Sequence, residues 1–547
     1  MRHFNAPDSL AQNSLFDAGV LDGTAWWATH LTPNALNHLQ EGWQGVFRRS
    51  VLALMPAENL GRHFDPLLGR PTKELYSMAA LTLIMEFKNW TIDTAAEAYS
   101  FHNDLHYALN LARDHQYLCP RSLDTYRKLV REDKLAGDIF TQVTTKLIEE
   151  LNISITKQRL DSTHLFSDMA VFGRTKLMAT AVKRFLTSLK RHAAESYNEL
   201  DAALRERYEV SQARLFGEAG SSAEGRTKAR QEVAQDMHAL IERFADDKAI
   251  NTRSSYRAMQ RIFEEHCEIK AGKISVRTKS RDVQGSSSHT MQNPSDDGAG
   301  YDGHKGSGYQ VQLAQTSAAS NPVQMITVCI PQSAGASDSA AVAQVIAAQQ
   351  AMSAVPDEMS ADTAYGSDAN VEHSAAHGID LISPVPGRRP KADQEVRAQK
   401  ADQEASQSEG RASGSELNEL SKAERIAQRR EREQSEEWRD KYRRRAGIES
   451  LNRGLDRVTG IKQLRVRGLV AVSHAVIGKA CGWNILQAAR AKAKAARAER
   501  KSGKLGSQKV GQALRDAWRR FDALVRACLL ASSARINALM NPRPAIQ

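Results

Sequence analysis

The pattern of apolar positions divides the chain into helical and extended regions. Residues 71–146 have helical spacing, and Leu75–Phe87 is so apolar that it predicts a buried core helix. Extended segments follow: one ends at Asp161, Tyr309–Gln315 alternates, and Gln324–Ile330 is apolar and rich in β-formers. With further short strands downstream, the pattern predicts one mixed sheet flanked by helices.

The order of the predicted elements defines the domains. A first strand ends at Asp161, a helical insertion follows, then two strands, a helix, a strand into Asp362, a helix, a strand and a late helix carrying Glu449. The predicted domains are a helical N-terminal domain that binds DNA at 1–150, a core at 151–175 and 271–387, a two-helix insertion at 176–270, a charged mobile loop at 388–415, a helical segment that completes the core at 416–470, and a basic helical region at 471–547.

Two of these regions leave alternatives open. In the N-terminal domain, a helix begins near Ser122, which suits an N-cap, and Arg127 and Lys128 fall on its exposed side. This helix fits a helix-turn-helix that enters the DNA major groove, and it fits an ordinary bundle equally well. In the insertion, the spacing predicts an antiparallel arm formed by 185–215 and 228–266, which serves either dimerisation or DNA clamping.

Charge points to an anionic partner. The 547-residue chain has a net charge of +11, and its pI is near 9.3. Between Arg453 and Arg520 there are 17 Lys and Arg against three acidic residues, so the basic surface is local and adjoins Glu449. The five cysteines form no CxxC pair, which fits a reducing cytoplasm. No run of about 18 apolar residues occurs, so we expect no membrane span.

Three acidic residues stand where a metal-dependent nucleic-acid enzyme needs them. Asp161 and Asp362 end predicted strands, and Glu449 lies on a helix. Carboxylates are the oxygen ligands that Mg²⁺ prefers, and a pair of such ions serves phosphoryl transfer. The alternative for each aspartate is that it caps a turn or a helix. Glu449 competes with nearby acids, among them Glu437 and Asp440. Asp302 and Asp338 are the reserve acids.

The late helix carries a spaced set of residues that resembles a known family. Tyr442, Arg445 and Glu449 match the first three positions of a Tyr-x2-Arg-x3-Glu-x6-Lys signature, whereas Asp456 replaces the final Lys and Arg457 stands one position late. Together with the order of the three acids, this resembles the DDE transposases of bacterial insertion sequences. The segment 301–310, Tyr-Asp-Gly-His-Lys-Gly-Ser-Gly-Tyr-Gln, also resembles that family. The resemblance implies a ribonuclease H-like core with a mixed five-stranded sheet.

The resemblance also implies an activity and its participants. A DDE transposase cleaves the ends of its element and joins them to target DNA, with two Mg²⁺ ions held by Asp161, Asp362 and Glu449; Mn²⁺ is a substitute. The residues expected to contact double-stranded DNA are Tyr442, Arg445, Arg457, His304, Lys305, Arg127 and Lys128. His164 and Asn452 are expected to support the metal ligands.

The remaining expectations concern the assembly and the alternatives to this activity. Two protomers are expected to act together on the terminal inverted repeats, in the bacterial cytoplasm at the nucleoid. The alternatives are an inactive DNA-binding protein derived from such an enzyme and a metal-dependent nuclease that only hydrolyses DNA. A tyrosine recombinase is not favoured, because no Arg/His/Arg set accompanies a candidate tyrosine.

Overall fold

The computed structural model describes residues 30–65, 72–111, 117–209, 222–282, 285–387 and 421–501. Two compact units are present, residues 1–488 and 489–547. The sheet, the helices around it and the candidate site all belong to the first unit. The predicted charged loop at 388–415 and the basic region beyond residue 501 lie outside the described residues.

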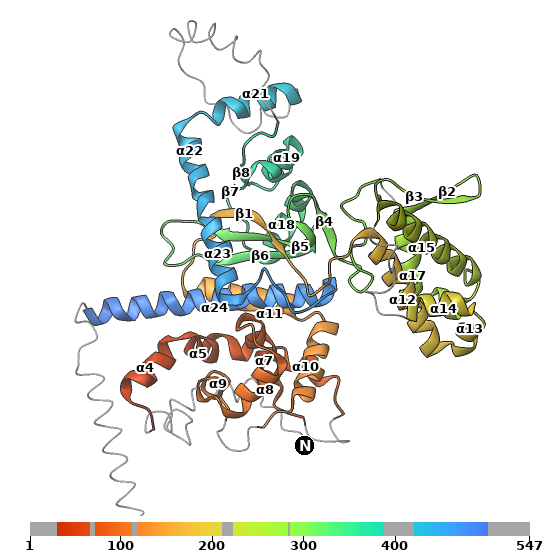
Figure 1. Ribbon diagram of the computed structural model, residues 1–547. Helices are drawn as coiled ribbons and strands as arrows, with labels where there is room; N and C mark the ends of the chain where they lie inside the picture. The colour runs from red at the N-terminus through yellow and green to blue at the C-terminus, as the bar shows by residue number, and fades with distance from the viewer. Residues whose placement is uncertain are drawn as a thin grey trace, which may run out of the picture. The chain divides into compact units, whose positions relative to one another are not determined.

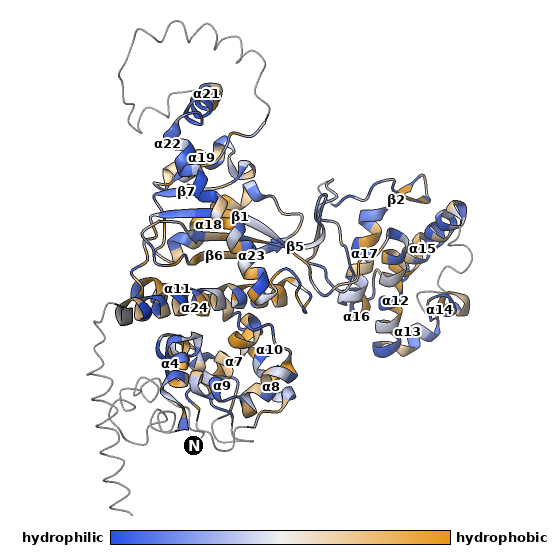
Figure 2. Cartoon of the chain, turned by 60° about the vertical axis from the view of Figure 1, so that its left-hand side comes forward, coloured by the Kyte–Doolittle hydropathy of each residue, from blue (hydrophilic) through white to orange (hydrophobic). Residues whose placement is uncertain are grey.

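Helices fill the N-terminal region, as the apolar spacing predicts (Figure 1). They are α4 (Pro33–Glu41), α5 (Trp43–Val46), η1 (Phe47–Val51), η2 (Leu52–Leu54), α6 (Ala57–Gly61), α7 (Leu75–Phe87), α8 (Ile92–Phe101), α9 (Asn103–Ala108), α10 (Pro120–Glu132) and α11 (Ala136–Glu150). All 13 residues of α7 are buried. A helix that is apolar on every side is a core helix, and the contrast between α7 and the hydrophilic α21 is visible in Figure 2.

Helix α10 begins earlier than the sequence predicts. Pro120 stands in its first turn after Cys119, so Ser122 lies inside the helix and is not its N-cap. Proline suits this position because the first helical N–H groups have no partner within the helix. Leu123, Tyr126 and Val130 are buried, and α10 packs on α7 and α8. The helix is thus one member of a packed bundle, and a role in reading DNA stays a prediction.

Six strands form the central mixed sheet. They are β1 (Lys157–Leu165), β4 (Gly300–Asp302), β5 (Gly306–Thr316), β6 (Ile326–Ser333), β7 (Glu358–Ser360) and β8 (Asp380–Ile382). Neighbouring strands follow the order β6–β5–β1–β7–β8 across the sheet, and the short strand β4 also pairs with β5. β5 is antiparallel to β1 and β6, whereas β1, β7 and β8 are parallel. This is the predicted ribonuclease H-like fold, with α18 (Asp338–Ala351) and α19 (Asp368–Ala376) between its strands.

The two faces of the sheet have different cover. One face packs against α18 in a single buried cluster, which includes Leu160, Ala314, Val328, Val342, Val345, Ile346 and Met359. Successive strand residues point to opposite faces, so the neighbours of Leu160, Arg159 and Asp161, face away from that cluster. The face they share is met by α23 (Gly447–Thr459), which packs against β1 and buries Ile448, Leu451 and Leu455.

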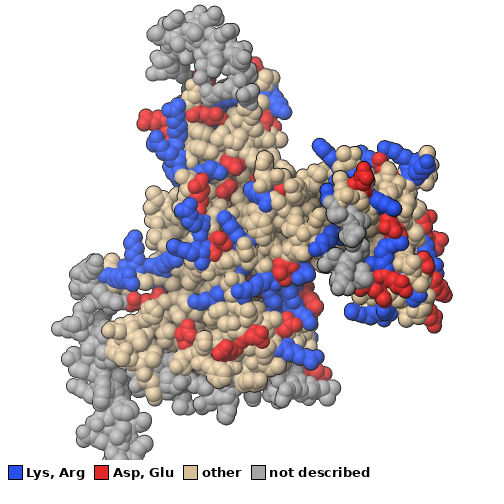
Figure 3. Space-filling model, viewed as in Figure 1, with Lys and Arg blue, Asp and Glu red and all other residues tan. Residues whose placement is uncertain are grey.

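Charged contacts attach the segment before α23 to the parallel edge of the sheet. Helices α21 (Lys422–Arg432) and α22 (Glu436–Arg443) precede α23, and α22 packs against β8. The Glu358 carboxylate pairs with Lys441 at 3.2 Å and with Arg444 at 2.7 Å. Basic and acidic side chains are interleaved along this edge in Figure 3. These pairs attach the segment to β7 and fix where α23 starts.

The insertion is more elaborate than the predicted two-helix arm. It contains α12 (Arg174–His192), α13 (Ala194–Asn198), α14 (Ala202–Glu209), α15 (Ala223–Arg243), α16 (Lys248–Asn251) and α17 (Ser254–His266), followed by the hairpin of β2 (Cys267–Lys270) and β3 (Lys273–Val276). Helices α12, α15 and α17 pack on one another around a core of their own that includes Phe185, Met237 and Met259. The prediction of a single pair of helices was wrong, because the apolar spacing did not reveal that α15, α16 and α17 are separate helices.

Helix α24 (Leu469–Lys501) joins the N-terminal bundle to the core. Lys479 is buried, and its ammonium donates to the Thr459 carbonyl at 2.6 Å, to the Glu86 carbonyl at 2.9 Å and to the Asn89 side chain at 3.2 Å. The stretch 469–498 is long and apolar enough to cross a membrane, yet 67% of its most apolar window is buried inside the protein. Buried contacts of this kind are typical of a core helix.

Candidate active site

The register of the sheet brings Asp161 and Asp362 side by side. In the parallel pair of β1 and β7, Arg159 stands opposite Ser360. Asp161 and Asp362 each come two residues later, so they reach the same level where neighbouring strands are about 4.8 Å apart. The prediction that the first strand ends at Asp161 was wrong, because pairing with β5 continues β1 to Leu165, whereas Asp362 does follow the end of β7. Asp362 also caps the short helix η5 (Thr363–Tyr365), because its carboxylate accepts from the Ala364 N–H at 2.9 Å. The pair therefore depends on strand pairing.

A single guanidinium lies between the two carboxylates. Nη2 of Arg445 is 3.8 Å from Oδ1 of Asp161 and 3.6 Å from Oδ2 of Asp362. Arg445 belongs to η8 (Arg444–Ala446), one turn before Glu449, in the segment that Glu358 attaches to β7. Both acids thus face one cation, which shows that their side chains converge on a common point.

Two further residues of the same segment surround the pair. The Asn452 amide donates to Oδ2 of Asp161 at 3.3 Å, while its Oδ1 is buried and has no hydrogen-bond partner among the described residues. Tyr442 stacks on Trp438 with ring centroids 4.9 Å apart. Its pKa is raised by burial, and Arg445 and Asp362 are among the charges that act on it. The pocket at the carboxylates is therefore polar, with an unused oxygen ligand.

The pair is electrostatically strained. Burial is the main cause that raises the pKa of Asp161 to about 6; Arg445 opposes this rise, and the charges of Asp362 and Asp338 add to it. Only 15% of the Asp161 side chain is exposed, against 34% for Asp362. Two carboxylates so placed repel each other and bind a cation readily.

Glu449 is placed differently from the two aspartates. It lies in the first turn of α23 and is exposed, and its carboxylate makes no hydrogen bond or ion pair with another residue that the structure describes. Arg445 precedes it by four residues and Asn452 follows it by three, so all three lie on one helix face. No set of three or more His, Cys, Asp or Glu side chains in the described ranges is close enough to hold a metal ion. The structure brings two of the three predicted ligands together, and it places the third on the helix face that carries Arg445 and Asn452.

The reserve acids both have structural contacts. Asp338, at the start of α18, accepts from Ser162 at 3.1 Å and from Gln312 at 2.8 Å on the opposite face of the sheet. Tyr365 donates to Gln312 at 2.5 Å, and burial raises the pKa of its hydroxyl. Asp302 accepts from the backbone N–H groups of the following turn. Neither acid joins Asp161 and Asp362.

The predicted DNA contacts around the core are mostly exposed. His304 and Lys305 occupy the turn between β4 and β5, where the Asp302 carboxylate binds their N–H groups at 2.7 and 2.8 Å. Arg457 is exposed two turns beyond Glu449. Asp456, at the fourth signature position, accepts from the Lys462 N–H at 3.0 Å and so holds the loop after α23.

Arg127 corrects one of these expectations. Its guanidinium forms an ion pair with Glu86 of α7 at 3.0 Å, and only 13% of the side chain is exposed. It therefore faces the bundle and not the solvent. Lys128 is exposed and pairs with Asp124 one turn earlier at 3.5 Å. Helical spacing alone could not show that Arg127 is buried and Lys128 is exposed, because the two residues lie on either side of the boundary between the buried and exposed faces of α10.

His164 does not approach the carboxylate pair. It stands three residues after Asp161, so the alternation of β1 turns it to the other face. Its ring contacts Phe166 at a centroid distance of 4.7 Å, and burial lowers its pKa. Asn452, the other expected supporting residue, does contact Asp161.

Sequence reasoning missed the residue that seats α23 on the sheet. Arg159 lies two residues before Asp161 on the same face and donates to the Arg444 carbonyl at 3.2 Å and to the Gln315 side chain at 2.6 Å. A Cβ at Gly447 would overlap its guanidinium. The strand period of two was the signal that could have found it.

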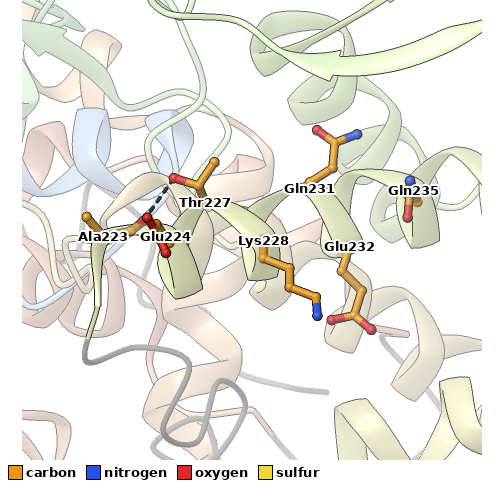
Figure 4. A pocket seen from close by; sticks show the side chains of 7 residues that line it. All are labelled: Ala223, Glu224, Thr227, Lys228, Gln231, Glu232 and Gln235. Atoms are coloured by element: carbon orange, nitrogen blue, oxygen red, sulfur yellow. Dashed lines mark hydrogen bonds between the residues drawn. The ribbon is translucent and has the colours of Figure 1, made fainter.

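Surface hollows lie elsewhere in the molecule. One of about 770 Å³ is lined by residues of α15, among them Lys228 and Glu232 (Figure 4). Another of about 1030 Å³ lies near Arg261 and Arg277, also in the insertion. Neither is lined by Asp161, Asp362 or Glu449.

The comparisons place this geometry in a family. Residues 278–485 match the family model described as a transposase DDE domain. The segment includes Asp362, Arg445 and Glu449, while Asp161 precedes it. No curated protein and no solved structure matches the chain. The resemblance to DDE transposases is confirmed, and the protein carries the DDE domain of that class, which supports a transposase-type function that acts on DNA.

Proposed function

We propose that this protein is a DDE transposase that cuts the ends of an insertion sequence and joins them to target DNA. The observation that carries the proposal is the register of β1 and β7, which sets Asp161 beside Asp362 under the helix segment that bears Arg445 and Glu449. The match of the DDE family model over 278–485 supports it.

The donor set fits divalent ions. Asp161 and Asp362 already face one cation, and the buried Oδ1 of Asn452 has no hydrogen-bond partner among the described residues. Two Mg²⁺ ions, or Mn²⁺ in their place, held by Asp161, Asp362 and Glu449, would supply activation of the attacking oxygen and stabilisation of the leaving oxygen. Glu449 is exposed and one helical turn from Arg445, on the helix face that also carries Asn452, which supports its role as the third ligand.

The chain's own basic residues would bind and orient the DNA. Arg445 and Tyr442 flank the carboxylates, and Arg457 continues the exposed side of α23. His304 and Lys305 extend the surface at the turn before β5. In the N-terminal bundle, Lys128 remains the exposed candidate on α10, with Arg121 and Thr125 on the same exposed side. Phosphate contacts of this kind fix the register of DNA on the protein.

The assembly follows from the reaction. Joining an element to new DNA requires both of its ends at one place, so two protomers would act together on the terminal inverted repeats. The protein would work at the bacterial nucleoid in the cytoplasm, where its DNA substrates lie. These statements rest on the activity proposed for the site.

A cleavage and strand-transfer assay with Mg²⁺ tests the proposal. The wild type is compared with Asp161→Asn, Asp362→Asn and Glu449→Gln, and Asp440→Asn on the exposed side of α22 is the control. We expect each of the three variants to lose roughly a thousandfold or more in cleavage rate while DNA binding is kept, and the control to match the wild type.

The other outcomes separate the alternatives. Binding without cleavage by the wild type would identify an inactive DNA-binding derivative. Cleavage without joining would identify a nuclease. Cleavage that survives all three substitutions would contradict the proposed site itself.

A further inference from the structure

Arg445 is held loosely where it lies. Its two ion pairs are 3.6 and 3.8 Å long, and its buried Nε has no hydrogen-bond partner among the described residues. Other arginines of the same region form much closer pairs: Arg425 with Asp368 at 2.7 Å and Arg432 with Asp380 at 2.6 Å. The Tyr442 side chain is a further hydrogen-bond partner of Arg445, so close hydrogen bonds do not tie the guanidinium to the two carboxylates.

The carboxylates, in contrast, need a counter-charge. Asp161 is mostly buried, and the negative charges of Asp362 and Asp338 act on it. A single positive charge cannot neutralise two ionised carboxylates, and a divalent ion binds them more strongly than a guanidinium at this distance does. The site therefore holds a cation that it can exchange.

We propose that Arg445 occupies the place of the divalent ions between Asp161 and Asp362 until those ions bind, and that its release makes the guanidinium available for a DNA phosphate. This inference rests on the proposed function of the site and concerns its regulation. Arginine suits the second task because its planar fork matches phosphate oxygens. Ion binding and DNA binding would thereby be coupled, since the same event opens the ion site and supplies a phosphate ligand.

Direct measurement of Mn²⁺ binding tests this exchange without any catalytic readout. The full chain at pH 8 is titrated with Mn²⁺, and free Mn²⁺ is followed by electron paramagnetic resonance. We expect Arg445→Gln to bind Mn²⁺ more tightly than the wild type by a factor on the order of ten, because the competing charge is removed.

Arg443 provides the matched control. It stands two residues away and carries the same charge, but its side chain is 75% exposed and pairs with Asp440 at 2.5 Å. Arg443→Gln removes a charge from the same segment without touching the carboxylates. We expect its Mn²⁺ affinity to stay within about twofold of the wild type, because exposed charges are screened.

A second variant covers the case in which Arg445→Gln does not fold. Arg445→Lys keeps the charge but replaces the fork with a single ammonium, so its Mn²⁺ affinity should fall between those of the wild type and Arg445→Gln. Folding of each variant is checked by circular dichroism.

Each result has one meaning. Equal or weaker Mn²⁺ binding by folded Arg445 variants would overturn the exchange while leaving the metal site intact. No saturable Mn²⁺ binding by the wild type or by any Arg445 variant would overturn the metal site, and the proposed function with it. Tighter binding that Asp362→Asn abolishes would support both.

Discussion

The aspartate pair and Glu449 are positioned by different kinds of interaction. Asp161 lies within β1 and Asp362 follows the adjacent parallel strand β7, so the backbone hydrogen bonds of β1 and β7 fix their separation. Glu449 lies on α23, whose place depends on how its side chains dock against β1, α7 and the neighbouring loops. The pair is largely shielded from solvent, and Glu449 is exposed.

This difference has a functional consequence. Strand register is discrete, because a slip of one residue would turn every side chain to the other face. Helix docking is continuous and can be altered by a single contact. Substitutions that disturb α23 should therefore impair the joint site while the two aspartates keep their places.

The strongest disturbance is expected at the far end of α23. Lys479 binds the Thr459 carbonyl at the end of α23 and the Glu86 carbonyl at the end of α7. Lys479→Met leaves these buried acceptors unpaired, so we expect a loss of about 2–4 kcal/mol in the free energy of unfolding. Cleavage should fall by a larger factor than Mn²⁺ affinity does, because Glu449 moves and the pair does not.

Chemical denaturation and the Mn²⁺ titration measure these two effects. Lys270→Met is the control, because the Lys270 side chain is 74% exposed and its partner Glu268 also pairs with Arg277. Unchanged stability of Lys479→Met would show that α23 does not depend on this contact.

A smaller effect is expected at the start of α23. A Cβ at Gly447 would overlap the Arg159 guanidinium, which Gln315 and the Arg444 carbonyl hold in place. Gly447→Ala should therefore destabilise the protein by about 1–3 kcal/mol, although alanine is normally the better helix former. Gly137 in α11 has open space around its Cβ direction, so Gly137→Ala should stabilise by about 0.5–1 kcal/mol. Thermal unfolding of the two variants checks the opposite signs.

The contrast between register and docking also explains what the sequence could predict. The alternation of β5 and the apolar run of β6 were sufficient to predict a mixed sheet flanked by helices. The strands of this sheet could be predicted because their periodicity is a property of consecutive residues in the sequence. The fully apolar α7 was recognisable for the same reason.

The features that the sequence did not predict depend on contacts between distant segments. Arg127 pairs with Glu86 across the bundle, and Arg159 supports a helix 285 positions further along the chain. The helices that the structure describes in the insertion are separated by short polar turns that the apolar spacing does not mark. The position of Glu449 relative to the two aspartates likewise depends on tertiary packing. The spacing of the signature could therefore identify Glu449 as a candidate ligand but could not predict where its side chain lies.

The smallest expected effects are changes in the free energy of unfolding caused by substitution of Asp161 and of Glu449. The folded-state pKa of Asp161 is about 6, above its ordinary value of 3.8, so the folded protein holds the proton more tightly than the unfolded chain does. Ionisation of Asp161 therefore costs stability as the pH rises from about 4 to about 6, with an upper bound of about 3 kcal/mol at higher pH. Asp161→Asn removes this cost but also removes one partner of Arg445, so we expect a net gain of about 1–2 kcal/mol at pH 8 without divalent ions, and little gain at pH 5.

Glu449→Gln should change the free energy of unfolding by less than about 0.5 kcal/mol at both pH values, because the Glu449 side chain is exposed and makes no hydrogen bond or ion pair with the described residues. Urea unfolding of the two variants and the wild type, at pH 5 and at pH 8, measures the contrast. Equal gains for both variants would mean that a general reduction of negative charge, and not the burial of Asp161, sets the effect. A gain confined to Asp161→Asn and to the higher pH would show that the protein keeps a strained carboxylate at a cost in stability, as a site built to bind cations does.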